Sequence, residues 1–169
     1  VLNTAKNGVP QNRPRVYIVG ILKDVDIGTF EWPSEIPCCS TSSLLDSRDQ
    51  MLACTGMPDK ESATADKNVR GFIKALIEKE AAPHVEDYII ACDADIKRSK
   101  CWLGQSPCLL SSKSKGFWIT SRGRRMTTEE QMRFQRIDPT TFNLEVSESE
   151  LQRQIGNAMS QCVIERVLN

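Results

Sequence analysis

Long apolar runs are absent from this 169-residue sequence. A helix that crosses a lipid bilayer needs about 18 or more consecutive apolar residues, and no stretch of the chain offers them. The opening residues VLNTAKNGVPQ also lack the basic start and the apolar core of a secretory signal. We therefore expect an intracellular protein that makes no contact with a membrane.

Histidine is nearly absent too, because His84 is the only one, and the seven cysteines form no C-x-x-C pair. Structural zinc sites need such clustered ligands, so we predict no metal site. An odd number of cysteines is also a poor framework for disulfides. We expect reduced thiols, most of them buried and inert.

The chain has no net charge, since 22 basic residues balance 22 acidic ones. This balance argues against a protein that coats nucleic acid. The basic residues are unevenly spread, however, and between Lys113 and Arg136 there are seven of them against two acidic residues. A local field of this kind can hold phosphate groups. A solvated surface face would have the same composition, so charge alone leaves both interpretations open.

The periodicity of apolar residues predicts the first regular elements. Residues 16–22, VYIVGIL, form a short apolar run typical of a strand that is buried on both faces. Residues 66–82 repeat apolar positions at intervals of three and four, which predicts an amphipathic helix that ends before Pro83. The inner face of this helix would comprise Val69, Phe72, Ile73, Leu76 and Ile77. Residues 88–91 and 117–120 are predicted strands.

Capping patterns predict the later helices. A helix over residues 127–137 would begin at Thr127 or Thr128, whose hydroxyl can accept hydrogen bonds from free amides. Its inward residues would be Met126, Phe134 and Ile137. Ser147 and Glu150 form a capping-box pattern for a short turn. A final helix is expected after Gly156, with Met159, Val163, Ile164 and Val167 inside.

The first of three specific motifs is GVPQNRPRVYIVG, residues 8–20. Gln11, Arg13 and Arg15 occupy alternate positions directly before the predicted strand, so their side chains should emerge on one side of it. Two guanidinium groups and an amide suit the recognition of phosphates and base edges. Alternatively, the arginines only bind backbone carbonyls near the strand.

The second motif is RRMTTEEQMRFQRID, residues 124–138, in which Glu130 and Arg133 are spaced to pair along one helix face. The third is QIGNAMSQCVIERVL, residues 154–168. Gly156 permits close approach of another backbone, and Asn157 would open a helix whose free amides could meet a small ligand. A capped terminal helix without any ligand is the alternative for this third motif.

In order and spacing these motifs resemble the last three conserved blocks of the cytosine-5 DNA methyltransferase family. Gln11, Arg13 and Arg15 match a PQ-x-R-x-R block. An R-x-L-T-x-x-E-x-x-R-x-Q-G-F-P block is matched by Arg124, Thr127, Glu130, Arg133 and Gln135. Here Met126 stands for Leu, Arg136 for Gly and Asp138 for Pro. Gly156 and Asn157 match the Gly-Asn block, and residues 106–123 resemble the end of a target-recognition region.

The resemblance implies double-stranded DNA as a partner, S-adenosylmethionine as methyl donor, and a flipped target cytosine. By the same resemblance, Arg13, Arg15 and Gln11 would be auxiliary catalytic residues near the flipped base, and Asn157 and Ala158 would line the methyl-donor site. The implied DNA contacts are Cys108, Ser111, Lys113, Lys115 and Arg122. Organisation of the recognition domain would fall to Arg124, Thr127, Glu130 and Arg133. A eukaryotic member would be expected in the nucleus.

The reactive blocks of that family are absent, because the sequence contains no Glu-Asn-Val and no F-x-G-x-G. Cys38 and Cys108 follow prolines, but both come after the arginine block, so neither is expected to be the nucleophile. We therefore expect the chain alone to be inactive and an N-terminal catalytic portion to act with it, in cis or in trans. A fragment of a complete enzyme, a subunit of a split enzyme and a non-catalytic DNA-binding module are all compatible with these features.

The resemblance also implies an α/β architecture: the C-terminal part of a Rossmann-like sheet domain plus a small mixed recognition domain. Residues 1–30 would finish the sheet domain, residues 31–145 would form the recognition domain, and residues 146–169 would return to the sheet domain as a C-terminal helix. Because the strand over residues 16–22 has no visible partners in the sequence, the isolated chain should be marginally stable or prone to aggregate.

Overall fold

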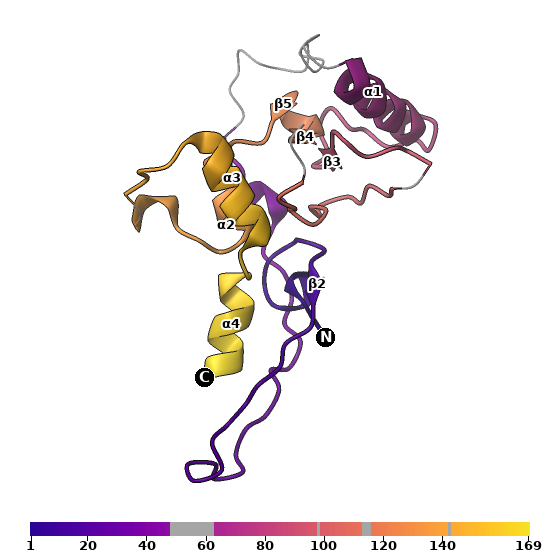
Figure 1. Cartoon of the computed structure of the whole chain (residues 1–169). Helices are drawn as coiled ribbons and strands as arrows, with labels where there is room; N and C mark the ends of the chain where they lie inside the picture. The colour runs from indigo at the N-terminus through magenta and orange to yellow at the C-terminus, as the bar shows by residue number, and fades with distance from the viewer. Residues whose placement is uncertain (48–62, 98, 113–115, 142) are drawn as a thin grey trace.

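A three-stranded antiparallel sheet contributes to the buried core and lies beside helix α1 (Ala63–Ile77) in Figure 1. The computed structural model describes residues 1–47, 63–97, 99–112, 116–141 and 143–169. The sheet has the order β3 (Ile89–Ala91), β4 (Phe117–Ile119), β5 (Arg124–Arg125), with Ile90 opposite Trp118 and Ile119 opposite Arg124. All residues of β3 and β4 are buried, which confirms the two strands predicted there.

Helix α1 (Ala63–Ile77) packs against this sheet through Val69 and Phe72, both buried. The helix was predicted, but it ends five residues before the expected boundary. The turn that ends it places Glu80 at a φ of 62°, and the Ala81 amide donates to the Leu76 carbonyl. Ile77, expected on the inner face, is 59% exposed because the helix ends there.

The second group of helices lies across the body from α1, as Figure 1 shows. Helix α2 (Thr128–Phe134) begins at a complete capping box formed by Thr127 and Glu130, and Met126 and Phe134 are buried as predicted. It ends before residue 137 because Arg136 adopts a positive φ of 64°. Helix α3 (Glu148–Asn157) packs beside α2, and the Ser147 hydroxyl caps it.

The last two helices differ from the prediction. Gly156 and Asn157 end α3 instead of opening the final helix, and α4 (Gln161–Leu168) begins after Ser160. Val163 is buried as expected, whereas Met159 lies between the helices and is 59% exposed. The free amides that the sequence suggested for a ligand at Asn157 are therefore not at a helix start.

Short elements complete the described chain. β1 (Leu2–Asn3) pairs antiparallel with β2 (Pro14–Arg15). The 3-10 helices are η1 (Thr4–Lys6), η2 (Thr41–Leu44), η4 (Thr120–Arg122) and η5 (Pro139–Thr141). The described residues thus form a mixed α/β fold with two small sheets, and a Rossmann-like sheet and the division at about residues 30 and 145 stay predictions. Within the described ranges, no helix is long and apolar enough to cross a membrane.

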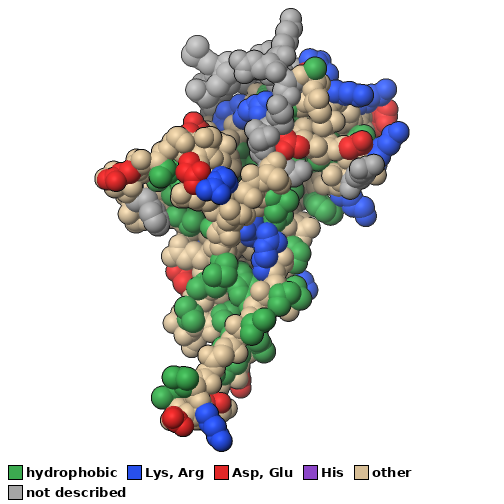
Figure 2. Space-filling model, in the orientation of Figure 1, with side chains coloured by type: hydrophobic (Ala, Val, Ile, Leu, Met, Phe, Trp, Pro, Cys, Tyr) green, Lys and Arg blue, Asp and Glu red, His purple; other side chains and the backbone are tan. Residues whose placement is uncertain are grey.

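Residues 16–35, which we call the arm, extend away from the body beside α4 (Figure 1). The buried strand predicted over residues 16–22 is wrong for this structure, since Val16, Ile18 and Leu22 are 73%, 91% and 77% exposed. A strand of this kind needs neighbours on its edges and cover on its faces, and the described residues supply neither. Figure 2 shows the resulting band of apolar side chains along the arm.

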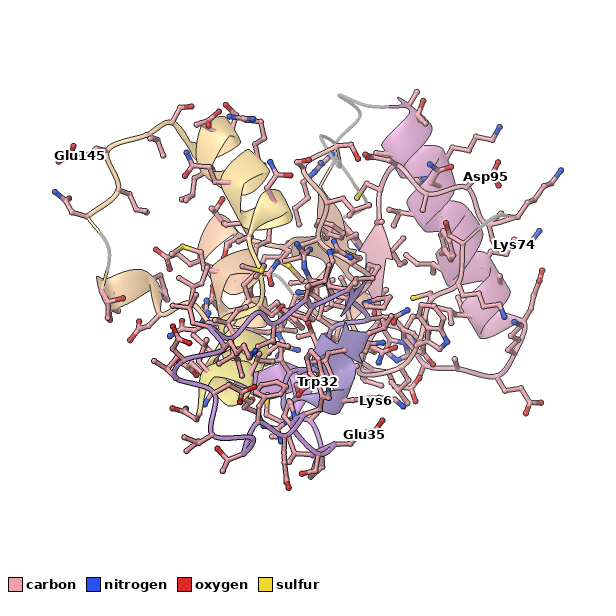
Figure 3. All side chains as sticks on the ribbon, turned by 60° about the horizontal axis from the view of Figure 1, so that its bottom comes forward. Lys6, Trp32, Glu35, Lys74, Asp95 and Glu145 are labelled. Carbon is pink, nitrogen blue, oxygen red and sulfur yellow. The ribbon has the colours of Figure 1, made fainter. Side chains whose placement is uncertain are left out.

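Two charged contacts hold the base of the arm. Lys6 and Glu35 form an exposed ion pair at 2.6 Å, and Figure 3 shows both beside Trp32. From α4, the Arg166 guanidinium donates to the Asn7 side-chain oxygen at 2.5 Å and to the Ser34 carbonyl at 2.6 Å. The N-terminal segment, the returning part of the arm and the C-terminal helix are therefore joined.

The cysteines are less uniformly buried than expected. All six described cysteines are free: Cys92 and Cys162 are buried, Cys38 is exposed, and the half-buried ones are Cys39, Cys101 and Cys108. Burial raises the pKa of Cys92 and Cys162 to about 11 and that of Cys101 to about 12. These three thiols are protonated at neutral pH, as the inert interpretation requires.

Candidate functional site

Arg13 joins two segments that are far apart in the sequence. Its side chain is 2% exposed, and the guanidinium donates to the carbonyls of Leu109, Gly156 at 2.9 Å and Ala158 at 2.5 Å. Burial is the largest cause of a lowered pKa for Arg13. These contacts match the alternative in which the arginine binds backbone carbonyls, and they tie the first motif to the third.

Gln11 and Gln135 add the second motif to the same centre. The Gln11 side chain, 0% exposed, donates to the Phe134 carbonyl at 2.9 Å. Gln135 donates to the Ile155 carbonyl at 3.1 Å and accepts a hydrogen bond from Ser160 at 2.7 Å. The three motifs therefore meet in one buried polar cluster, although about 120 residues separate the first from the second along the chain.

Gly156 shows why the third motif needs a residue without a side chain. A Cβ atom at this position would lie 2.6 Å from Ser111 Cα and closer still to the Ser111 amide nitrogen. Real side chains do not tolerate such approaches to backbone, so the end of α3 and the segment at Ser111 can touch only through glycine. The close approach predicted from the sequence is confirmed.

Cys108 lies between the two arginines of the first motif. Its Sγ is 3.4 Å from one Arg13 nitrogen and 3.3 Å from one Arg15 nitrogen. Arg13 is buried, whereas Arg15 is only half-buried and also donates to the Pro14 carbonyl. The accessible positive charge at this place therefore belongs to Arg15, and Arg13 holds the backbone around it.

Glu130 organises the start of α2. It is 0% exposed and accepts two hydrogen bonds from Arg124 at 2.8 and 2.9 Å, with two more from the Thr127 and Asp46 amides. Burial alone would raise the pKa of Glu130, but these hydrogen bonds outweigh it and the pKa is lowered. The predicted Glu130–Arg133 pair does not form, because the capping box directs Glu130 back to Thr127. Arg133 instead binds Asp46 at 2.6 Å.

The residues expected to contact DNA (Cys108, Ser111, Lys113, Lys115 and Arg122) and those expected at the methyl-donor site (Asn157 and Ala158) differ in accessibility. Ser111 and Asn157 are exposed, and Cys108 and Ala158 are half-buried. The Arg122 side chain is 8% exposed and pairs with Asp87 at 3.1 Å, so it is committed to the protein interior. Lys113 and Lys115 lie outside the described residues. Sequence analysis missed Asp46 and Asp87, since no motif or spacing marks either of them.

The comparisons with known proteins identify the family. A family model described as C-5 cytosine-specific DNA methylase matches residues 1–169. The chain therefore belongs to the C-5 cytosine-specific DNA methylases.

Two curated relatives agree with this assignment. The type II methyltransferase M.NlaX of Neisseria lactamica is 27% identical over 173 residues, which cover 99% of this chain and 49% of that protein. The type II methyltransferase M.HaeII of Haemophilus aegyptius is 26% identical over 168 residues, covering 99% of this chain and 48% of that protein. The chain thus spans about half the length of the curated relatives it matches.

Proposed function

We propose that the chain is the C-terminal portion of a DNA cytosine-5 methyltransferase that contributes target recognition and part of the base and cofactor sites. The observation that supports this most strongly is the set of buried hydrogen bonds that joins the three motifs: Gln11 donates to the Phe134 carbonyl, Gln135 to the Ile155 carbonyl and Arg13 to the Gly156 carbonyl. These bonds link residues 123 and 143 positions apart in the sequence, and a satisfied buried polar network of this kind fixes the relative positions of its members. The family membership agrees with such a unit.

In this proposal each motif residue has a separate task. Arg13 holds the backbone of Leu109, Gly156 and Ala158, while the more accessible Arg15 faces the phosphate or the flipped base. Cys108, beside Arg15, and the exposed Ser111, beside Gly156, contact DNA. Arg122 is not included, because its charge is paired with Asp87.

S-adenosylmethionine, when bound, supplies the methyl group. The described residues fit one edge of such a site, because the Asn157 amide is exposed and can both donate and accept a hydrogen bond. Ala158 follows directly, with its carbonyl held by Arg13. The Pro-Cys and Glu-Asn-Val blocks would come from an N-terminal catalytic portion, joined to this chain or bound to it.

A methyl-transfer assay tests the proposal. We expect radiolabelled methyl transfer to duplex DNA when the chain is fused to, or mixed with, a catalytic portion that carries both blocks, and none from the chain alone. Arg15→Ala should reduce the rate at least tenfold, whereas Arg153→Ala, which changes an exposed arginine of α3, should not.

Activity of the chain alone would contradict the division of labour. If neither arrangement transfers methyl groups but the chain binds duplex DNA with strong salt dependence, the non-catalytic DNA-binding module would replace the enzyme.

A further inference from the structure

A hollow beside α1 is lined by basic residues that the motifs do not include. It has a volume of about 550 Å³ and lies between the end of α1 and residues 96, 97 and 99–102. Lys79, Lys97 and Lys100 line it together with Trp102, and none of its lining residues is acidic. We call this hollow, with Lys79, Lys97, Lys100 and Trp102 on its walls, the lysine groove.

The lysine groove continues toward the candidate site. A second hollow shares Phe72, Ser99, Lys100, Cys101 and Trp102 with it. This second hollow extends to Pro107, Cys108 and Leu110. Since Cys108 Sγ lies 3.3 Å from Arg15, the residues that line the two neighbouring hollows extend from the surroundings of Arg15 to the end of α1.

The three lysines of the groove are free to bind an anion. All three are exposed, and none forms an ion pair with any residue that the structure describes. Two acids close to these lysines in the sequence have partners of their own. Asp95 accepts from the backbone amide of Lys97, and Glu78 pairs with Lys74 at 3.9 Å. Lys74 and Asp95 lie on the α1 side of the molecule in Figure 3.

Trp102 gives the groove an aromatic surface, since its side chain is 39% exposed. Unpaired lysines beside an exposed aromatic ring match the two features of a nucleic-acid strand, its phosphates and the apolar faces of its sugars and bases.

We propose that the lysine groove binds the phosphate backbone of the DNA that flanks the target base. This rests on the proposed function, because the DNA is the same substrate that Arg15 faces. The groove adds affinity and position along the strand, not chemistry, so its loss should weaken binding without changing the chemical step.

Salt-dependent DNA binding by the whole chain tests the groove. Each lysine that contacts a phosphate adds about 1 to the slope of log Kd against log salt concentration. The triple variant Lys79→Ala, Lys97→Ala, Lys100→Ala should therefore lower the slope by about 2 to 3. A matched control, Lys23→Ala, Lys67→Ala, Arg153→Ala, removes the same charge from exposed positions outside the groove and should leave the slope nearly unchanged.

Tryptophan fluorescence gives a second readout. In a Trp32→Phe background the two remaining tryptophans are Trp102 and the buried Trp118. Duplex DNA should quench the emission, and a further Trp102→Phe change should remove the quenching.

The outcomes separate the two proposals. Duplex binding with equal slopes in both triple variants, or quenching that survives without Trp102, would overturn the groove while the proposed function stands. Failure of the unsubstituted chain to bind duplex DNA at all would overturn the groove, whereas the methyl-transfer assay with the catalytic portion decides the proposed function.

Discussion

Arg13 is a cation without a carboxylate partner among the described residues, and this sets its role. A planar guanidinium offers five donors in fixed directions, which suits carbonyls from several segments better than the point charge of a lysine would. Its Nε is buried without a hydrogen-bond partner. The side chain therefore satisfies the hydrogen-bonding needs of several backbone carbonyls while one of its own donors is left unsatisfied. Such an arrangement is expected where a residue holds neighbouring segments in place.

Glu130 is a buried carboxylate whose charge is held by Arg124. Glu130→Gln should lower the free energy of unfolding at pH 7 by roughly 3 kcal/mol, because Arg124 loses its buried partner. Since the pKa of Glu130 is lowered in the fold, its contribution is fully present above the unfolded value of about 4.3 and disappears as the pH falls through the folded pKa. Urea denaturation at pH 7 and at acidic pH measures both effects.

The control for Glu130 lies in the same turn. Glu129→Gln changes an exposed carboxylate in the first turn of α2 and should alter stability by no more than about 0.5 kcal/mol. The difference in unfolding free energy between Glu130→Gln and the unsubstituted chain should shrink at acidic pH. A difference that stays constant down to acidic pH would contradict the buried ion pair.

At the scale of elements, the sequence predicted the features that depend on nearby residues, such as helix caps and amphipathic faces. The capping box at Thr127, the serine cap at Ser147 and the apolar face of α1 were all visible in the sequence and are present in the fold. The helix ends were misplaced where a single residue with positive φ stops the helix, as at Glu80 and Arg136. Neither is a glycine, so composition gave no sign of the turn.

Contacts between distant segments were predicted only in outline. The sequence placed Gln11, Arg13 and Gly156 in one functional unit through a resemblance, but it did not show that they hold one another's backbone. Pairs such as Asp46 with Arg133 are 87 residues apart, and no periodic pattern connects them. The prediction of a buried strand over residues 16–22 was wrong for a related reason. An apolar run shows that a segment would be stabilised by neighbouring strands, but it does not show that those strands are there.

The joint between α3 and the segment at Ser111 depends on Gly156. Gly156→Ala should lower the free energy of unfolding by roughly 1 to 3 kcal/mol, because the new methyl group would meet backbone that cannot turn aside. Gly20→Ala is the matched control, since nothing lies within 4 Å of its added Cβ. Thermal denaturation of the two variants should separate them, and equal melting temperatures would show that the contact is not tight.

At the scale of the whole molecule, the arm exposes apolar side chains that the described residues do not cover. Its apolar residues are exposed, and one side of it faces the end of α4 across a hollow of about 480 Å³ lined by Ile21, Val25, Ile27, Val167 and Leu168, among others. Exposed apolar surface of this extent is characteristic of an interface. An N-terminal catalytic portion that supplied sheet strands would cover it.

Polar substitution of the arm tests this interpretation. The variant Ile18→Ser, Leu22→Ser, Ile27→Ser should reduce self-association of the isolated chain, because three side chains that are 77% to 91% exposed would no longer favour burial against another copy. Static light scattering over a concentration series measures the effect. Ile77→Ser with Leu103→Ser, at 59% and 57% exposure away from the arm, is the control and should change little. If the unsubstituted chain is monomeric, or if the control variant reduces self-association equally, the arm is not the surface through which the chain associates.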